Sequence, residues 1–160
     1  MRRLFQRFCG RTAPRCRSED QDEGGVPQSA VLAYRWRQRE PEVILVTSRS
    51  TRRWVLPKGN LEPGMTPAES AAKEAFEEAG VLGTTDARCI STYTYVKADE
   101  SAGRRRCHVQ VFPMLVQTVC EDWPERKQRD RVWMTPEQAA RRVDESELKA
   151  LLIDFRRHLQ

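Results

Sequence analysis

The residues best suited to chemistry are three glutamates, Glu74, Glu77 and Glu78, in the segment AAKEAFEEAG. On a helix they share roughly a 100° arc, opposite an alanine-rich face. Like charges three and four residues apart repel, and the helix dipole disfavours anions near the C-terminal end. A solvated polar face is the simpler interpretation, but a divalent cation held by carboxylate oxygens would reverse both penalties. The sequence therefore predicts a Mg²⁺ site, with Mn²⁺ as the alternative metal.

The helix that must position these glutamates has clear start and stop signals. Thr66 to Glu69 form a capping box with proline at the first helical position, which predicts a helix over 67–79. Gly80 supplies the stop. Gly59 opens the preceding loop, and its lack of a side chain would let the backbone approach the helix and a bound phosphate.

The other elements follow from apolar and β-branched runs. Alternating or continuous apolar runs predict strands over 29–36, 42–48, 52–57, 89–97, 107–117 and 131–134. A second capping box at Thr135 predicts a helix over 136–142, and Asp144 with Glu147 predicts the start of a last helix. The expected fold is an α/β (α+β) domain with a mixed β-sheet and helices packed on it.

Charge is distributed unevenly along the 160 residues. Six arginines and no acid lie within residues 1–17, and the rest of the chain has 22 basic against 23 acidic side chains. We expect a basic tail and linker over 1–25, a domain over 26–160 and no specific nucleic-acid partner. No apolar run approaches the roughly 18 residues of a membrane span. The five cysteines are odd in number and include no C-x-x-C pair, which argues against metal–thiolate sites and a disulfide framework. This suits a reducing compartment, and we expect a cytoplasmic protein.

The stretch from Gly59 to Val81 resembles the signature of the Nudix hydrolase family, G-x5-E-x7-R-E-U-x-E-E-x-G-U, where U is apolar. The matching positions are Gly59, Glu74, Ala75, Glu77, Glu78, Gly80 and Val81. Met65 stands where the family has its first glutamate and Lys73 where it has arginine, which indicates that one bracing ion pair is lost. The resemblance implies the Nudix fold, a sheet sandwiched between helices. It also implies a metal site formed by Glu74, Glu77 and Glu78 beside Gly59.

From Gln28 onward the chain is similar to the diphosphoinositol polyphosphate and diadenosine polyphosphate hydrolase subgroup. The resemblance rests on SAVLAYR, VILVTSRSTRRWVLPKG, RRRCHVQVF and EDWPERKQRDRVWMTPEQA. Gln28 departs from an arginine, and Lys58 from a glycine, of the inositide-cleaving members.

The activity implied is Mg²⁺-dependent hydrolysis of a phosphoanhydride in a highly phosphorylated small molecule. The alternatives are a pyrophosphatase for ADP-ribose or another nucleoside diphosphate sugar, and a non-catalytic binding module. Glu74, Glu77 and Glu78 are the expected catalytic residues, and the water could be activated by Glu78, Glu77, Glu62 or Glu121. Basic residues suited to phosphate complete the prediction: Arg52, Arg53, Lys58, Arg104, Arg105, Arg106 and Arg129.

Overall fold

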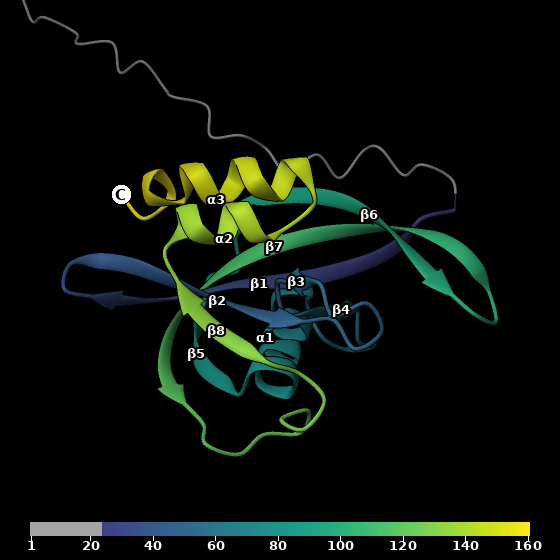
Figure 1. The fold of residues 1–160 in the computed structure, drawn as a ribbon, viewed down its shortest axis with the longest axis horizontal. Coiled ribbons are helices and arrows are strands. Elements are labelled where there is room, and N and C mark those ends of the chain that lie inside the picture. The colour runs from purple at the N-terminus through teal and green to yellow at the C-terminus, as the bar shows by residue number, and fades with distance from the viewer. Residues whose placement is uncertain (1–23) are drawn as a thin grey trace, which may run out of the picture.

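A mixed eight-stranded sheet forms the centre of the computed structural model, which describes residues 24–160 (Figure 1). The strands are β1 (Val26–Arg37), β2 (Glu40–Thr47), β3 (Trp54–Val55), β4 (Lys58–Asn60), β5 (Val81–Thr85), β6 (Ser91–Asp99), β7 (Gly103–Val119) and β8 (Arg131–Met134). The main path runs β3-β2-β1-β7-β5, while β4 pairs with β1, β6 with β7 and β8 with β2. Only the β1–β7 pair is parallel among these described strands.

Helices cover both faces of this sheet. Helix α1 (Pro67–Ala79) packs its alanines against Val31 and Ile44, whereas α2 (Pro136–Arg142) and α3 (Ser146–His158) cover Leu32 and Leu45 on the other face. Successive residues of β1 and β2 thus enter opposite cores, as the alternation of side chains along a strand requires. Figure 1 shows α2 and α3 together on one side of the sheet. The predicted sandwich of a mixed sheet between helices is confirmed.

The helix signals in the sequence act as expected with one exception. Both capping boxes are formed, and Gly80 ends α1 in the left-handed conformation at φ 62°. Helix α3 is different, because its N-cap is Glu145 and no side chain caps it. Asp144 instead accepts a hydrogen bond from Arg53 at 2.9 Å.

The structure departs from the sequence-based expectations in two further places. The predicted strand over 52–57 is shorter than expected, since β3 covers only Trp54–Val55, and a separate strand β4 (Lys58–Asn60) that was not predicted follows Pro57. Strand β5 was not expected, since VLGTT is short and follows the helix directly. Of the described cysteines, Cys107 and Cys120 are free thiols.

The basic tail predicted over 1–25 lies almost entirely outside the described residues. No described helix has both the length and the apolar character needed to cross a membrane.

Candidate active site

Glu74, Glu77 and Glu78 of α1 line a cavity of about 740 Å³. The cavity is formed by α1, by β4 and the loop before β3, by the C-terminal end of β6, and by the loop before β8. The charged residues that line it are Arg49, Arg53, Lys58, Glu74, Glu77, Glu78, Lys97, Asp99, Glu100, Glu125 and Arg129. All three predicted glutamates and Gly59 therefore face one cavity.

Glu78 is the most constrained of the three carboxylates. Its side chain is 7% exposed; Oε1 lies 2.7 Å from Arg129 Nη2, and Oε2 accepts the Lys58 backbone N–H at 3.2 Å. Burial raises the pKa of Glu78 to about 7, although Arg129 and Lys58 oppose the rise. A carboxyl group held in this way can exchange a proton near neutral pH.

Glu74 lies directly against the loop glycine. A Cβ built on Gly59 would stand 2.2 Å from Glu74 Oε1, so only glycine leaves room for this carboxylate. Burial, followed by repulsion from Glu77, raises the pKa of Glu74 to about 6. The predicted close approach of the Gly59 backbone to the helix is confirmed.

Lys73 makes ion pairs other than the one expected to be lost with Met65. Met65 is 45% exposed, but Lys73 Nζ lies 3.1 Å from Glu62 Oε1 and 3.1 Å from Glu77 Oε1. The Glu62 backbone N–H also donates to Ser70 Oγ at 3.0 Å. Glu62, three positions before Met65, thus connects the loop before α1 to the helix.

Three further acids that line the cavity, Asp99, Glu100 and Glu125, were missed by the sequence reasoning, and Glu125 is the one that contacts α1. Its N–H donates to the Glu77 carbonyl at 3.0 Å, and its Oε2 lies 2.5 Å from Arg129 Nε. Neither Glu62 nor Glu121, the loop acids considered from sequence, lines the cavity. The available signal was the spacing of Glu125 and Arg129 by four residues, but only the fold shows that this loop returns to the end of α1.

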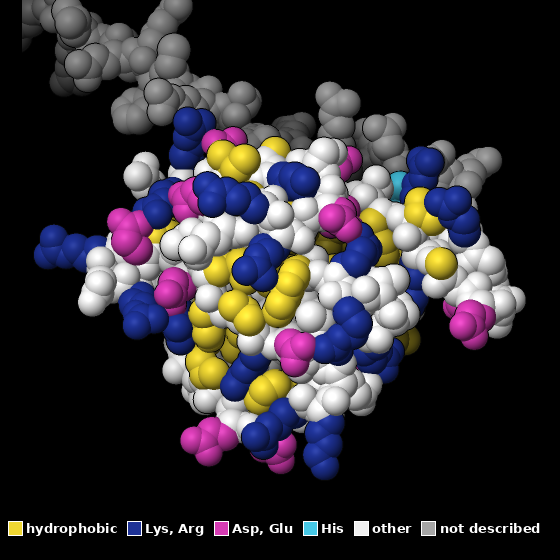
Figure 2. Space-filling view, viewed as in Figure 1, with side chains coloured by type: hydrophobic (Ala, Val, Ile, Leu, Met, Phe, Trp, Pro, Cys, Tyr) yellow, Lys and Arg dark blue, Asp and Glu magenta, His cyan; other side chains and the backbone are white. Residues whose placement is uncertain are grey.

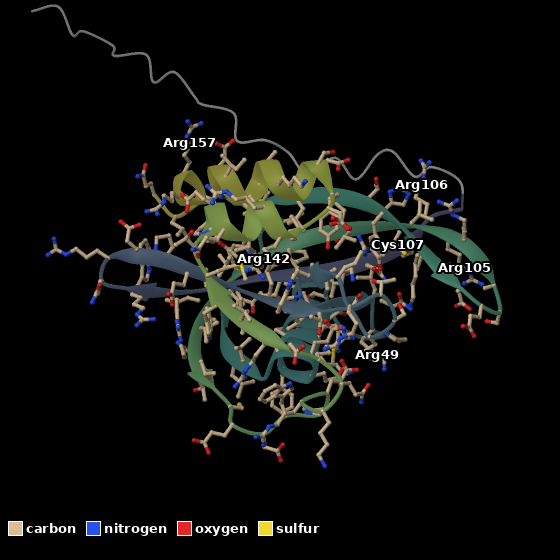
Figure 3. The ribbon with its side chains drawn as sticks, in the orientation of Figure 1. Arg49, Arg105, Arg106, Cys107, Arg142 and Arg157 are labelled. Atoms are coloured by element: carbon tan, nitrogen blue, oxygen red, sulfur yellow. The ribbon has the colours of Figure 1, made fainter. Side chains whose placement is uncertain are left out.

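The seven predicted phosphate-binding residues are divided by the structure. Arg53, Lys58 and Arg129 line the main cavity, and Arg105 lines an adjoining space of about 100 Å³. Arg52, Arg104 and Arg106 line neither. Arg49 and Lys97 line the main cavity and were not predicted. Figure 3 shows Arg49 and Arg105 on the side of the molecule that carries β4 and the β6–β7 hairpin, away from Arg157 on α3.

Several of these cations are already paired with acids. Arg129 contacts Glu78 and Glu125, Arg53 lies 2.9 Å from Asp144 Oδ2, and Arg49 lies 3.6 Å from Glu125 Oε1. Figure 2 shows basic and acidic side chains interspersed on the visible face. Arg129 therefore positions two carboxylates of the cavity as well as contributing positive charge.

The cavity's donor set suits a hard divalent cation. Within residues 24–160 no three acidic, histidine or cysteine side chains form a group with metal-ligand geometry, and Glu77 and Glu78 instead contact Lys73 and Arg129. Six acidic residues nevertheless line one cavity, and both Glu77 and Glu125 raise the pKa of Glu74 by repulsion. Clustered carboxylate oxygens of this kind are ligands that Mg²⁺ and Mn²⁺ prefer.

Comparison with known proteins agrees with this fold and site. Residues 26–155 match the NUDIX domain, and the chain belongs to this family. It is 35% identical over 120 residues to diphosphoinositol polyphosphate phosphohydrolase 3-beta of Bos taurus, covering 73% of this chain and 68% of that protein. It is 37% identical over 103 residues to Nudix hydrolase 12, mitochondrial, of Arabidopsis thaliana, covering 61% of this chain. The match spans only half of the plant protein's length.

Among solved structures, a C. elegans Ap4A hydrolase has the same fold. Its TM-score is 0.59 at 21% identity, covering 85% of this chain and 99% of that one.

Proposed function

We propose that this protein is a Mg²⁺-dependent pyrophosphohydrolase that cleaves a phosphoanhydride in diphosphoinositol polyphosphates or dinucleoside polyphosphates. The observation that carries the proposal is the cavity itself, which is lined by Glu74, Glu77, Glu78 and Glu125 and by Lys58. Family membership and the named relatives support the same class of reaction.

Glu74, Glu77 and Glu125 are the residues we assign to holding the metal, with Gly59 keeping space for Glu74. When bound, the metal would neutralise phosphate charge and increase the acidity of water. The side chains of the protein supply the other contributions to catalysis. Phosphoanhydrides resist attack because their anionic oxygens repel a nucleophile, so cations around the cavity must offset that charge.

Glu78 is the residue we assign as the general base. Arg129 and the Lys58 N–H fix its two oxygens, so that the carboxylate is oriented within the cavity where a water would give up its proton. Glu62 and Glu121 are less suited to this role because they lie outside the cavity lining.

The test is phosphate release from a panel of diphosphate compounds, including ADP-ribose, with Mg²⁺ and with chelator. We expect release from polyphosphate substrates, loss with chelator, and a rate at least about 100-fold lower in Glu78→Gln. The matched variant Glu147→Gln, on α3, should be unaffected. Preference for ADP-ribose would favour the nucleotide-sugar alternative, and tight binding without release would favour a binding module. A cytoplasmic location stays a prediction.

A further inference from the structure

Arg52 has a backbone conformation that residues with a side chain disfavour. It lies in the loop between β2 and β3 at φ 56°, in the left-handed region. The other two non-glycine residues with positive φ in the described part of the chain, Gln38 and Arg39, form the two-residue turn between β1 and β2, which favours that conformation. Backbone strain persists where the surrounding structure fixes the residue, so the contacts of the Arg52 side chain are informative.

The side chain of Arg52 joins its loop to the loop before β8. Its Nη1 donates to the Gln128 carbonyl oxygen at 2.9 Å, and its Nη2 donates to Asp130 Oδ2 at 2.5 Å. A planar guanidinium group that donates from two nitrogens fixes orientation as well as distance. Arg52 lines neither cavity, so its guanidinium group acts on the protein and not on a molecule in the cavity.

The residue between these two acceptors is Arg129, which orients Glu78. The Arg129 side chain is 8% exposed; its Nη2 donates to Glu78 Oε1 at 2.7 Å and its Nη1 donates to the Thr47 carbonyl oxygen at 3.0 Å. Thr47 at the end of β2 also accepts the Asp130 N–H on its hydroxyl oxygen at 2.9 Å. The contacts of Arg52 therefore fix the chain on both sides of Arg129.

A second arginine of the same loop makes a parallel connection. Arg49 Nη1 donates to Gln128 Oε1 at 3.3 Å and lies 3.6 Å from Glu125 Oε1. The loop is also closed on itself, because the Ser48 carbonyl oxygen accepts the Arg52 N–H at 3.1 Å. The strained residue thus lies where two loops that line the cavity are joined.

We propose that Arg52 is a positioning residue for the reaction, because it fixes Arg129 and, through Arg129, the carboxylate of Glu78. This inference rests on the proposed hydrolysis and on the assignment of Glu78 as its general base. The side chains of Arg52 and Asp130 are 51% and 69% exposed, and ion pairs of this kind contribute little to stability. Their contact matters for the orientation of a catalytic group, since a small displacement of such a group strongly lowers the rate.

The experiment measures kcat and KM for diadenosine tetraphosphate and for a diphosphoinositol polyphosphate, with Mg²⁺, together with urea unfolding. The proteins are wild type, Arg52→Gly, Arg52→Lys and Arg39→Gly. Arg39 is exposed at φ 66° and lines neither cavity, so its variant controls for the loss of an arginine at positive φ. Glycine adopts positive φ without strain, so neither glycine variant should unfold at a lower urea concentration than wild type.

For the compound that wild type hydrolyses faster, kcat should fall about tenfold in Arg52→Gly while KM stays within about twofold, because the base loses its orientation and the cavity lining is unchanged. Arg52→Lys keeps the charge but not the two-nitrogen fork, and its kcat should fall about three- to fivefold. Arg39→Gly should match wild type in both constants. A loss of kcat without a loss of stability is the result that a merely structural role does not give.

A wild-type kcat in Arg52→Gly overturns this inference, and so does a raised KM with unchanged kcat, which would show that Arg52 binds substrate. If Arg52→Gly does not fold, Arg52→Lys decides, and a wild-type kcat in that variant overturns the inference. An active Glu78→Gln variant removes the general base and this inference with it, while hydrolysis stands. Hydrolysis of neither compound by wild type overturns the proposed function together with the inference.

Discussion

Replacing Gly59 with alanine should separate metal binding from folding. The new Cβ would stand 2.2 Å from Glu74 Oε1 and 2.3 Å from its Cδ, distances that no real contact allows. The obstructed group is the end of a flexible side chain, so Glu74 can turn away while the backbone stays in place. We therefore expect the free energy of unfolding to fall by less than about 1 kcal/mol. The displaced carboxylate should weaken Mn²⁺ binding by about 10- to 100-fold.

Gly83→Ala provides the matched control, because its Cβ would stand 2.0 Å from a backbone atom, the Leu115 carbonyl oxygen. A backbone atom cannot rotate away as the end of a side chain can. The free energy of unfolding of this variant should therefore fall by about 1–3 kcal/mol, without a change in metal affinity. Calorimetric Mn²⁺ titration and urea unfolding on all three proteins give both quantities. If Gly59→Ala binds Mn²⁺ as tightly as wild type, Glu74 is not a ligand in the way the geometry indicates.

Three other predictions concern the charges of the cavity. Glu74 and Glu78 have folded-state pKa values of about 6 and about 7, above the ordinary 4.5, so the folded state holds protons that the unfolded state has released. Stability without metal should therefore fall as pH rises from about 5 to about 8, and a melting temperature that rises over this range would contradict it. Arg129→Met should lose about 3–5 kcal/mol in urea unfolding, because it strands buried carboxylates, whereas the exposed Arg52→Met should lose at most about 1 kcal/mol. Lys73→Met should strengthen Mn²⁺ binding about threefold in calorimetry by releasing the Glu77 carboxylate, and weaker binding would show that the lysine positions that carboxylate.

Local signals predicted the fold well because each element carries its own chemistry. The capping boxes at Thr66 and Thr135 gave α1 and α2 the bounds that the structure shows. The apolar runs of β1 and β2 gave the central strands. Strand β5 was not predicted because its own composition carries no strand signal. It forms a strand because it pairs with β7.

The candidate site was predictable where it lies within one helix and its loop. Glu74, Glu77, Glu78 and Gly59 face one cavity, as their spacing indicated. Contacts between distant segments were not predictable in the same way. Pairing of Arg129 with Glu78 spans 51 residues, and sequence alone placed this arginine among the phosphate-binding groups. Glu125 and Lys97 enter the cavity only because the chain folds back to it.

Calorimetric titration of Mn²⁺ into wild type, Glu77→Gln and Glu147→Gln tests the central claim most directly, since each variant loses one negative charge. Glu77 lines the cavity and Glu147 lies exposed on α3. We predict that wild type and Glu147→Gln bind Mn²⁺ equally, and that Glu77→Gln binds at least about tenfold more weakly. Absence of Mn²⁺ uptake by wild type, with or without diadenosine tetraphosphate, or equal binding by the two variants, would contradict a metal site built on these glutamates.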